Sequence, residues 1–96
     1  MNKPEMIKEE LNQYEWYSLG YESFTFTYIV KVRELRKSRA HLKAEIDWSR
    51  KVYRFIPCYK EKCNSLDIIA MFKHMNNFQK VATKYGYKFV QEEMSE

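Results

Sequence analysis

The feature that most constrains the fold is a strict alternation of residue types over residues 23–34. Aromatic and aliphatic side chains occupy every second position, and threonine, isoleucine and basic residues fall between them. A two-residue period rich in β-branched and aromatic residues is typical of a strand with one face in the core. We therefore expect a long strand whose core face carries Phe24, Phe26, Tyr28, Val30 and Val32.

Two further alternating segments predict a second strand at residues 42–48 and a third at 52–56, which Pro57 would end. The short link Ser49-Arg50 would join them as an antiparallel hairpin. If Ile46 lies opposite Tyr53, apolar side chains meet on one face of the hairpin and Glu45 meets Arg54 on the other, so this register is preferred.

The remaining connections follow from composition. The polar, basic stretch from Leu35 to Ala40 is expected to be a connector between the first two strands. If those strands are antiparallel neighbours, Lys31 can lie opposite Glu45. Residues 14–18 fit either a helix or a short strand, and residues 88–90 can add a last short strand.

Helices are predicted at both ends of the chain. Pro4 suits the first turn of a helix over residues 4–14, where Ile7, Leu11 and Tyr14 share one face. Gly20 is placed to end that helix or to form the next turn. A helix over residues 65–85 would end before Gly86. Its expected core stripe is Ile68, Met71, Phe72, Met75, Phe78, Ala82 and Tyr85.

These elements predict one two-layer α+β domain over residues 1–96, in which both helices cover one face of a three-stranded antiparallel sheet. No run of about 18 apolar residues indicates a membrane span. The two cysteines, Cys58 and Cys63, are too few for a disulfide scaffold and fit reduced thiols in a cytoplasmic protein.

Positive charge is concentrated in the middle of the chain. The net charge is +4, yet residues 31–62 alone hold eleven basic and four acidic side chains. Such asymmetry favours an anionic partner, nucleic acid first. The expected binding surface, on the outer sheet face and the adjoining loops, consists of Lys31, Arg33, Arg36, Lys37, Arg39, Lys43, Arg50, Lys51 and Arg54, with Ile29 and Ile56.

Catalytic and metal sites find little support. A zinc site would have to gather Cys58, Cys63, His41 and His74 from a loop, a strand and the middle of a helix. No glycine-rich phosphate loop and no activated nucleophile can be named, so we expect no cofactor, no metal and no enzyme activity. The weakest alternative is a metal-independent ribonuclease toxin that uses Arg54, Tyr53, Lys43 and His41.

The order helix, three strands, helix resembles that of double-stranded-RNA-binding domains. That family has a lysine-rich start to its second helix, whereas this chain has Asn64-Ser65-Leu66-Asp67 there, so the family is not assigned. The exposed sheet face also lacks the aromatic pair with which RNA-recognition motifs stack bases.

The sequence therefore predicts a small non-catalytic binding or regulatory protein, an inhibitor or adaptor of the kind that mobile elements encode. Its partner would be a protein bound around an apolar centre of Ile29, Val52 and Ile56, or a second copy paired along the first strand. The alternative is a nucleic-acid-binding module that uses the same basic surface.

Overall fold

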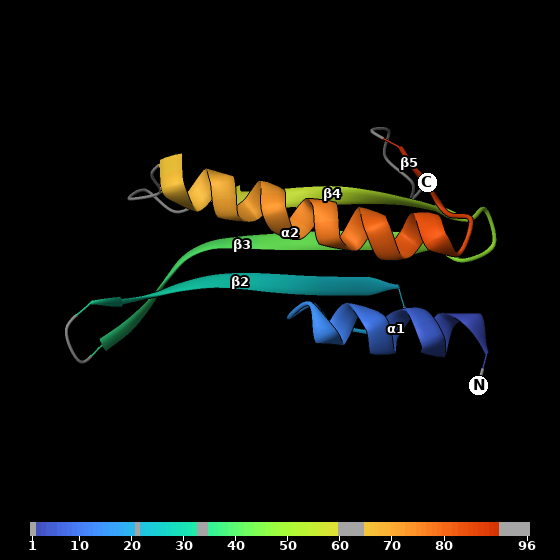
Figure 1. Ribbon diagram of the computed structural model, residues 1–96, viewed down its shortest axis with the longest axis horizontal. Helices are drawn as coiled ribbons and strands as arrows, with labels where there is room; N and C mark the ends of the chain where they lie inside the picture. The colour runs from blue at the N-terminus through green and yellow to red at the C-terminus, as the bar shows by residue number, and fades with distance from the viewer. Residues whose placement is uncertain (1, 21, 33–34, 60–64, 91–96) are drawn as a thin grey trace.

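The described residues form two helices and a mixed sheet, seen along the shortest axis of the molecule in Figure 1. The computed structural model describes residues 2–20, 22–32, 35–59 and 65–90, with residues 27–32, 35–40 and 57–59 by their backbone alone. Within these ranges the elements are α1 (Lys3–Gln13), β1 (Tyr17–Ser18), β2 (Ser23–Val32), β3 (Leu35–Asp47), β4 (Val52–Tyr59), α2 (Ser65–Lys84) and β5 (Lys88–Phe89).

The α+β class and the two terminal helices are confirmed, whereas the predicted three-stranded antiparallel sheet is confirmed only in part. The sheet has five strands, in the order β1-β2-β3-β4-β5. β1 pairs antiparallel with β2, and β5 pairs parallel with β4 after the α2 crossover. Each added strand is only two residues long. A two-residue strand has too few residues for an alternating pattern to stand out, so the sequence left both open.

β2 and β3 form a much longer hairpin than expected. β3 begins at Leu35, so the predicted polar connector is instead paired strand. Val32 pairs with Leu35, and Lys31 therefore lies opposite Arg36, while Glu45 lies opposite Ser23. The expected pairing of Lys31 with Glu45 is wrong for that reason. The ladder also shifts register between Tyr28 and Ile29, a bulge that leaves residue 39 as the extra residue of β3.

The β3–β4 hairpin has the predicted register, with Glu45 opposite Arg54 and Ile46 opposite Tyr53. Two of its expected limits are wrong. The link is Trp48–Lys51 rather than two residues, since Lys51 takes a φ of 59° and its N–H donates to the Asp47 carbonyl at 2.8 Å.

Pro57 does not end β4, which continues to Tyr59. Pro57 lies opposite Leu42 on β3, while β5 pairs only with Val52 and Tyr53 on the other side of β4. At Pro57 one side of β4 therefore has no neighbouring strand among the described residues. Proline is tolerated on such an edge, because its missing N–H would face away from the ladder.

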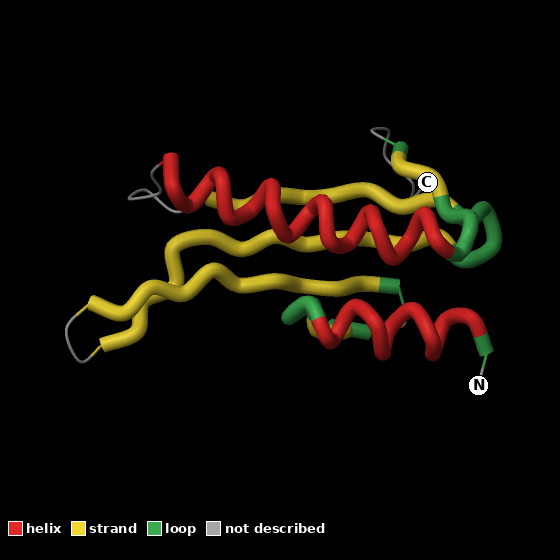
Figure 2. The backbone as a smooth tube through the Cα atoms, viewed as in Figure 1, coloured by secondary structure: helices red, strands yellow, loops and turns green. Residues whose placement is uncertain are grey.

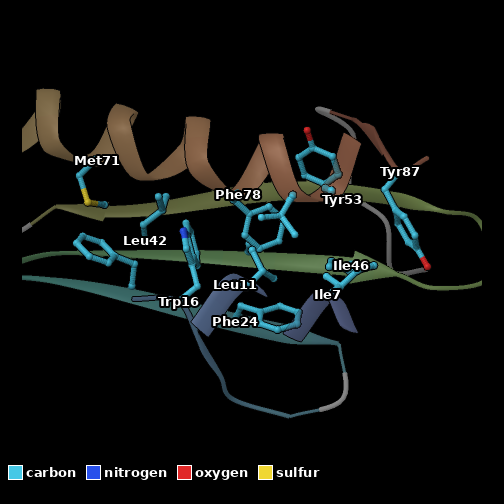
Figure 3. Packing of buried hydrophobic residues seen from close by; sticks show 14 residues of the cluster. Ile7, Leu11, Trp16, Phe24, Leu42, Ile46, Tyr53, Met71, Phe78 and Tyr87 are labelled. Atoms are coloured by element: carbon cyan, nitrogen blue, oxygen red, sulfur yellow. The ribbon is translucent and has the colours of Figure 1, made fainter. Parts of the chain in front are cut away.

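One core lies between the helices and the inner face of the sheet (Figure 3). α1 contributes Ile7 and Leu11, as predicted. Phe78 of α2 points toward the sheet and is fully buried, with ring centroids 4.9 Å from Trp16 and 5.3 Å from Phe55. Trp16, in the segment left open between helix and strand, is also fully buried. Most of the aromatic side chains of the chain thus lie in or against this core.

α2 is rotated relative to the predicted stripe. Met71, Phe78 and Ala82 are buried as expected, but the buried face also carries Asp67 and Val81. Ile68 and Phe72, which were expected in the core, are exposed instead. Together with Leu66 and Ile69 they form an exposed cluster on the first two turns, the α2 patch. Apolar residues surround this part of the helix, so spacing alone could not choose the buried face.

Both helices end in the same hydrogen-bonded motif. After α1, the N–H groups of Glu15 and Trp16 donate to the carbonyls of Asn12 and Leu11 at 3.1 and 3.0 Å. After α2, Gly86 and Tyr87 make the equivalent bonds to the helix. The residue past each helix takes a positive φ, 85° at Gly86 and 67° at Glu15. Gly86 was predicted for this role, whereas Gly20, which was expected either to end the first helix or to form the next turn, lies beyond β1.

Candidate nucleic-acid interface

The predicted basic surface is divided between two ends of the sheet. Arg50 and Lys51 lie in the β3–β4 turn, whereas residues 31, 36, 37 and 39 lie at the far end of the β2–β3 hairpin. Arg33 falls outside the described residues. In Figure 1 the two ends lie at opposite sides of the view. A single compact ligand could not contact both, since the molecule extends 44 Å along its longest axis.

The far end of the β2–β3 hairpin projects beyond the rest of the fold. We call residues 29–32 and 35–38, the four ladder pairs past the bulge, the distal hairpin. Figures 1 and 2 show it extending past the start of α2, at the end of the molecule away from α1. With a strand rise of about 3.3 Å per residue, these four pairs span roughly 10 Å.

Charge is dense along this projection. Of its eight residues three are basic, namely Lys31, Arg36 and Lys37, and none is acidic. The ladder sets Lys31 opposite Arg36, and Lys37 opposite Val30. Like charges at directly opposite positions disfavour an antiparallel ladder by up to about 1 kcal/mol, and a bound polyanion would relieve that repulsion.

The outer face of the sheet body carries less unbalanced charge than predicted. Arg54 lies beside Glu45, with Nη2 3.2 Å from Oε2, so this cation is already neutralised. Lys43 is exposed on the same face. The expected apolar centre is not continuous, because Ile56 lies opposite Lys43, Val52 lies opposite Asp47, and Ile29 lies beyond the bulge.

At the β3–β4 turn, Asp47 organises the backbone that presents Arg50 and Lys51. Its Oδ1 accepts hydrogen bonds from the N–H of Ser49 at 3.1 Å and of Arg50 at 3.0 Å, and from the Ser49 hydroxyl at 2.7 Å. These bonds, led by the Arg50 N–H, lower the pKa of the Asp47 carboxyl. Arg50 and Lys51 therefore lie in a tight turn, not on a projecting pair of strands.

The residues considered for zinc or catalysis are scattered. His41 lies opposite Cys58 in the β3–β4 ladder, while His74 stacks on Phe26 with ring centroids 3.6 Å apart. Cys63 lies outside the described residues. In the part of the chain that the structure describes, no group of three or more His, Cys, Asp or Glu side chains could hold a metal ion.

The ribonuclease set is likewise not assembled on one face. Tyr53 is buried in the core and only 1% exposed, whereas its neighbour Arg54 points to the opposite face.

A cleft between α1 and α2 holds Glu10 and Lys84 as an ion pair, with Oε1 and Nζ 2.6 Å apart. That hydrogen bond raises the pKa of Lys84, so the amine stays charged and paired rather than acting as a base.

Sequence reasoning found the basic residues of the distal hairpin but not their arrangement. The clue was present, because Val30, Val32 and Leu35 continue a strand-like pattern up to the turn. The basic residues after Leu35 obscured it, since charged stretches more often form loops. The α2 patch was missed because two of its members, Ile68 and Phe72, were assigned to the core.

No family model, curated protein or solved structure matches this chain. Neither α1 nor α2, the helices found among the described residues, has the length and apolar character needed to cross a bilayer.

Proposed function

We propose that this protein is a non-catalytic nucleic-acid-binding protein whose binding element is the distal hairpin. The observation that carries the proposal is a two-stranded ribbon that projects past the helices and carries Lys31, Arg36 and Lys37 without an acidic residue. Phosphate contacts by Lys and Arg supply most of the affinity of proteins that bind nucleic acid without strict sequence preference.

The dimensions of the ribbon suit a duplex. The major groove of B-DNA is about 12 Å wide and 8.5 Å deep and admits a two-stranded β-ribbon. A projection of roughly 10 Å is long enough to reach its floor. Proteins that read DNA with strands rather than helices use such ribbons. Double-stranded DNA is therefore the favoured ligand over single strands.

A protein partner on the sheet face, which the sequence favoured first, has less support. Arg54 is paired with Glu45, and the three aliphatic residues expected at an apolar centre do not adjoin one another. In the distal hairpin, by contrast, no basic residue has an acidic ladder partner. Lys31, for example, lies opposite Arg36.

Fluorescence anisotropy with a labelled 20-base-pair duplex, a single strand and an RNA duplex would test the proposal at 50 and 200 mM salt. If about four phosphates are contacted, the slope of log affinity against log salt is about −3.6, and duplex affinity falls about 150-fold over that range. An interface with an apolar centre would change far less over the same range.

A matched pair of variants locates the contact. Arg36→Gln/Lys37→Gln removes two charges from the distal hairpin, and Arg50→Gln/Lys51→Asn removes two from the opposite end, where asparagine suits the positive φ of 59°. We expect the first to weaken binding by at least about tenfold and to reduce the slope by about 2, and the second to change little. Absence of binding at 50 mM salt, or equal losses in both variants, would refute the proposal.

A further inference from the structure

The two faces of the distal hairpin differ in chemistry. Residues alternate between the two faces along a strand, and residues at directly opposite ladder positions share a face. Phe24 and Phe26 are buried under the helices, so the even positions of β2 belong to the inner face and the odd positions to the outer face. In the distal hairpin the outer face holds Ile29, Lys31, Arg36 and Ser38, and the inner face holds Val30, Val32, Leu35 and Lys37. Polar residues thus gather on the outer face and apolar residues on the inner face.

The position of the helices decides which face a duplex can meet. Both described helices pack on the inner side of the sheet, and Figure 1 shows the distal hairpin extending past the start of α2. The projection is roughly 10 Å long, close to the groove depth of about 8.5 Å. A hairpin inserted to the groove floor therefore brings the start of α2 close to the phosphates on the inner side. The hairpin can lean over the base edges only with its outer face.

From this arrangement we infer that the distal hairpin reads guanine in the major groove, with Lys31 and Arg36 as the residues that determine sequence preference. The inference rests on the proposed function and adds the base contacts to it. Guanine presents two acceptors there, O6 and N7, and Arg or Lys on these atoms is the commonest specific contact. Lys31 lies directly opposite Arg36, and the Cα atoms of such pairs are about 4.5–5.5 Å apart. Both cations therefore reach the same short stretch of the groove floor.

Composition singles out guanine among the bases. Adenine is read in the major groove by Asn or Gln, and cytosine by Asp or Glu. The eight residues of the distal hairpin include none of these four types. Ser38, the other polar residue of the outer face, can bond to any base and adds no strong preference. Guanine is therefore the base for which this face has a matching two-bond partner.

Lys37 provides an internal comparison. It follows Arg36 in the sequence and carries the same charge, but it lies opposite Val30 on the inner face. With the outer face toward the base edges, Lys37 lies on the side of the phosphates at the groove rim. Phosphate contacts position a protein without carrying sequence information, whereas base contacts specify. Arg36 and Lys37 thus both add affinity, but Arg36 alone of the two adds preference.

Modified bases test the contact directly. Fluorescence anisotropy would compare labelled duplexes of one length, with alternating G·C, alternating A·T, and G·C in which inosine or 7-deazaguanine replaces guanine. One two-bond contact corresponds to about 5- to 150-fold discrimination, so two should favour G·C over A·T by at least about tenfold. Inosine keeps O6 and N7 and loses the minor-groove amino group, so affinity should stay within about twofold of the G·C value. 7-Deazaguanine lacks N7 and should remove most of the preference.

A matched pair of single variants tests the two faces. Arg36→Gln should lower the preference for G·C over A·T by at least about fivefold. Lys37→Gln should weaken binding to every duplex by a similar factor and keep the preference. Each variant should reduce the slope of log affinity against log salt by about 1, since each removes one cation from the phosphate field.

The outcomes separate this inference from the proposed function. Equal affinity of the natural chain for all duplexes, or a preference that 7-deazaguanine or Arg36→Gln leaves unchanged, would overturn the base contacts. Salt-dependent duplex binding would in that case still support the proposed function. An equal loss of preference in Lys37→Gln would reject the assignment of faces and with it the inference. If no duplex binds, the proposed function and this inference both fail.

Discussion

Trp16 joins the N-terminal segment to the core, and its replacement by phenylalanine gives a defined energetic test. The indole is fully buried between Phe26, Phe55 and Phe78, with ring centroids 6.2, 6.2 and 4.9 Å away. Its Nε1–H donates to the backbone carbonyl of His74 at 3.1 Å. The side chain therefore ties the residues after α1 to the middle of α2.

Trp16→Phe keeps an aromatic ring but removes the indole N–H and part of the buried volume. We expect about 1 kcal/mol from the hydrogen bond and about 1–2 kcal/mol from the cavity. The entropy of unfolding is about 0.2 kcal/mol/K for a chain of 96 residues, so Tm should fall by roughly 10–15 °C.

Urea denaturation followed by circular dichroism measures this loss without depending on tryptophan fluorescence. Tyr17→Phe is the matched control, because Tyr17 is the next residue and its side chain is 56% exposed. The control should stay within about 0.5 kcal/mol of the natural chain. If Trp16→Phe costs less than about 1 kcal/mol, or no more than the control, the indole does not join the two segments as described.

Three further changes have signs fixed by the structure. Glu15→Gly should stabilise the fold by about 1 kcal/mol by relieving the positive φ of 67°, and Gly86→Ala should destabilise it by a similar amount, both measured by thermal melting. Burial lowers the pKa of His74, and the Glu15 carboxylate opposes this in part. The unfolded chain thus binds the proton more tightly, so stability should be highest above the ordinary histidine pKa of about 6.5 and fall as pH drops through the lowered folded value. Urea midpoints at pH 8 and pH 5 should show this fall for the natural chain, and His74→Gln should reduce it.

The sequence correctly predicted those parts of the fold for which a residue pattern fitted only one structure. The β3–β4 register followed from apolar residues opposite apolar residues, with Glu45 opposite Arg54. It failed where a pattern fitted two solutions. At the start of α2, apolar residues occur on every side, so Phe72 was assigned to the core although it is exposed. Beyond the bulge, β3 projects past the helix layer. Because the helices do not cover it there, its residues need not alternate between apolar and polar.

The bulge after Tyr28 separates two parts of the molecule that differ in how much a substitution would disturb the core. On one side, side chains such as Phe24 and Phe26 fill a dense core, where most changes would cost folding free energy. On the other side, ladder pairs could be added, removed or recharged in steps of two residues while the body keeps its shape. The hairpin could thus change in length or charge without a change in the packing of the core.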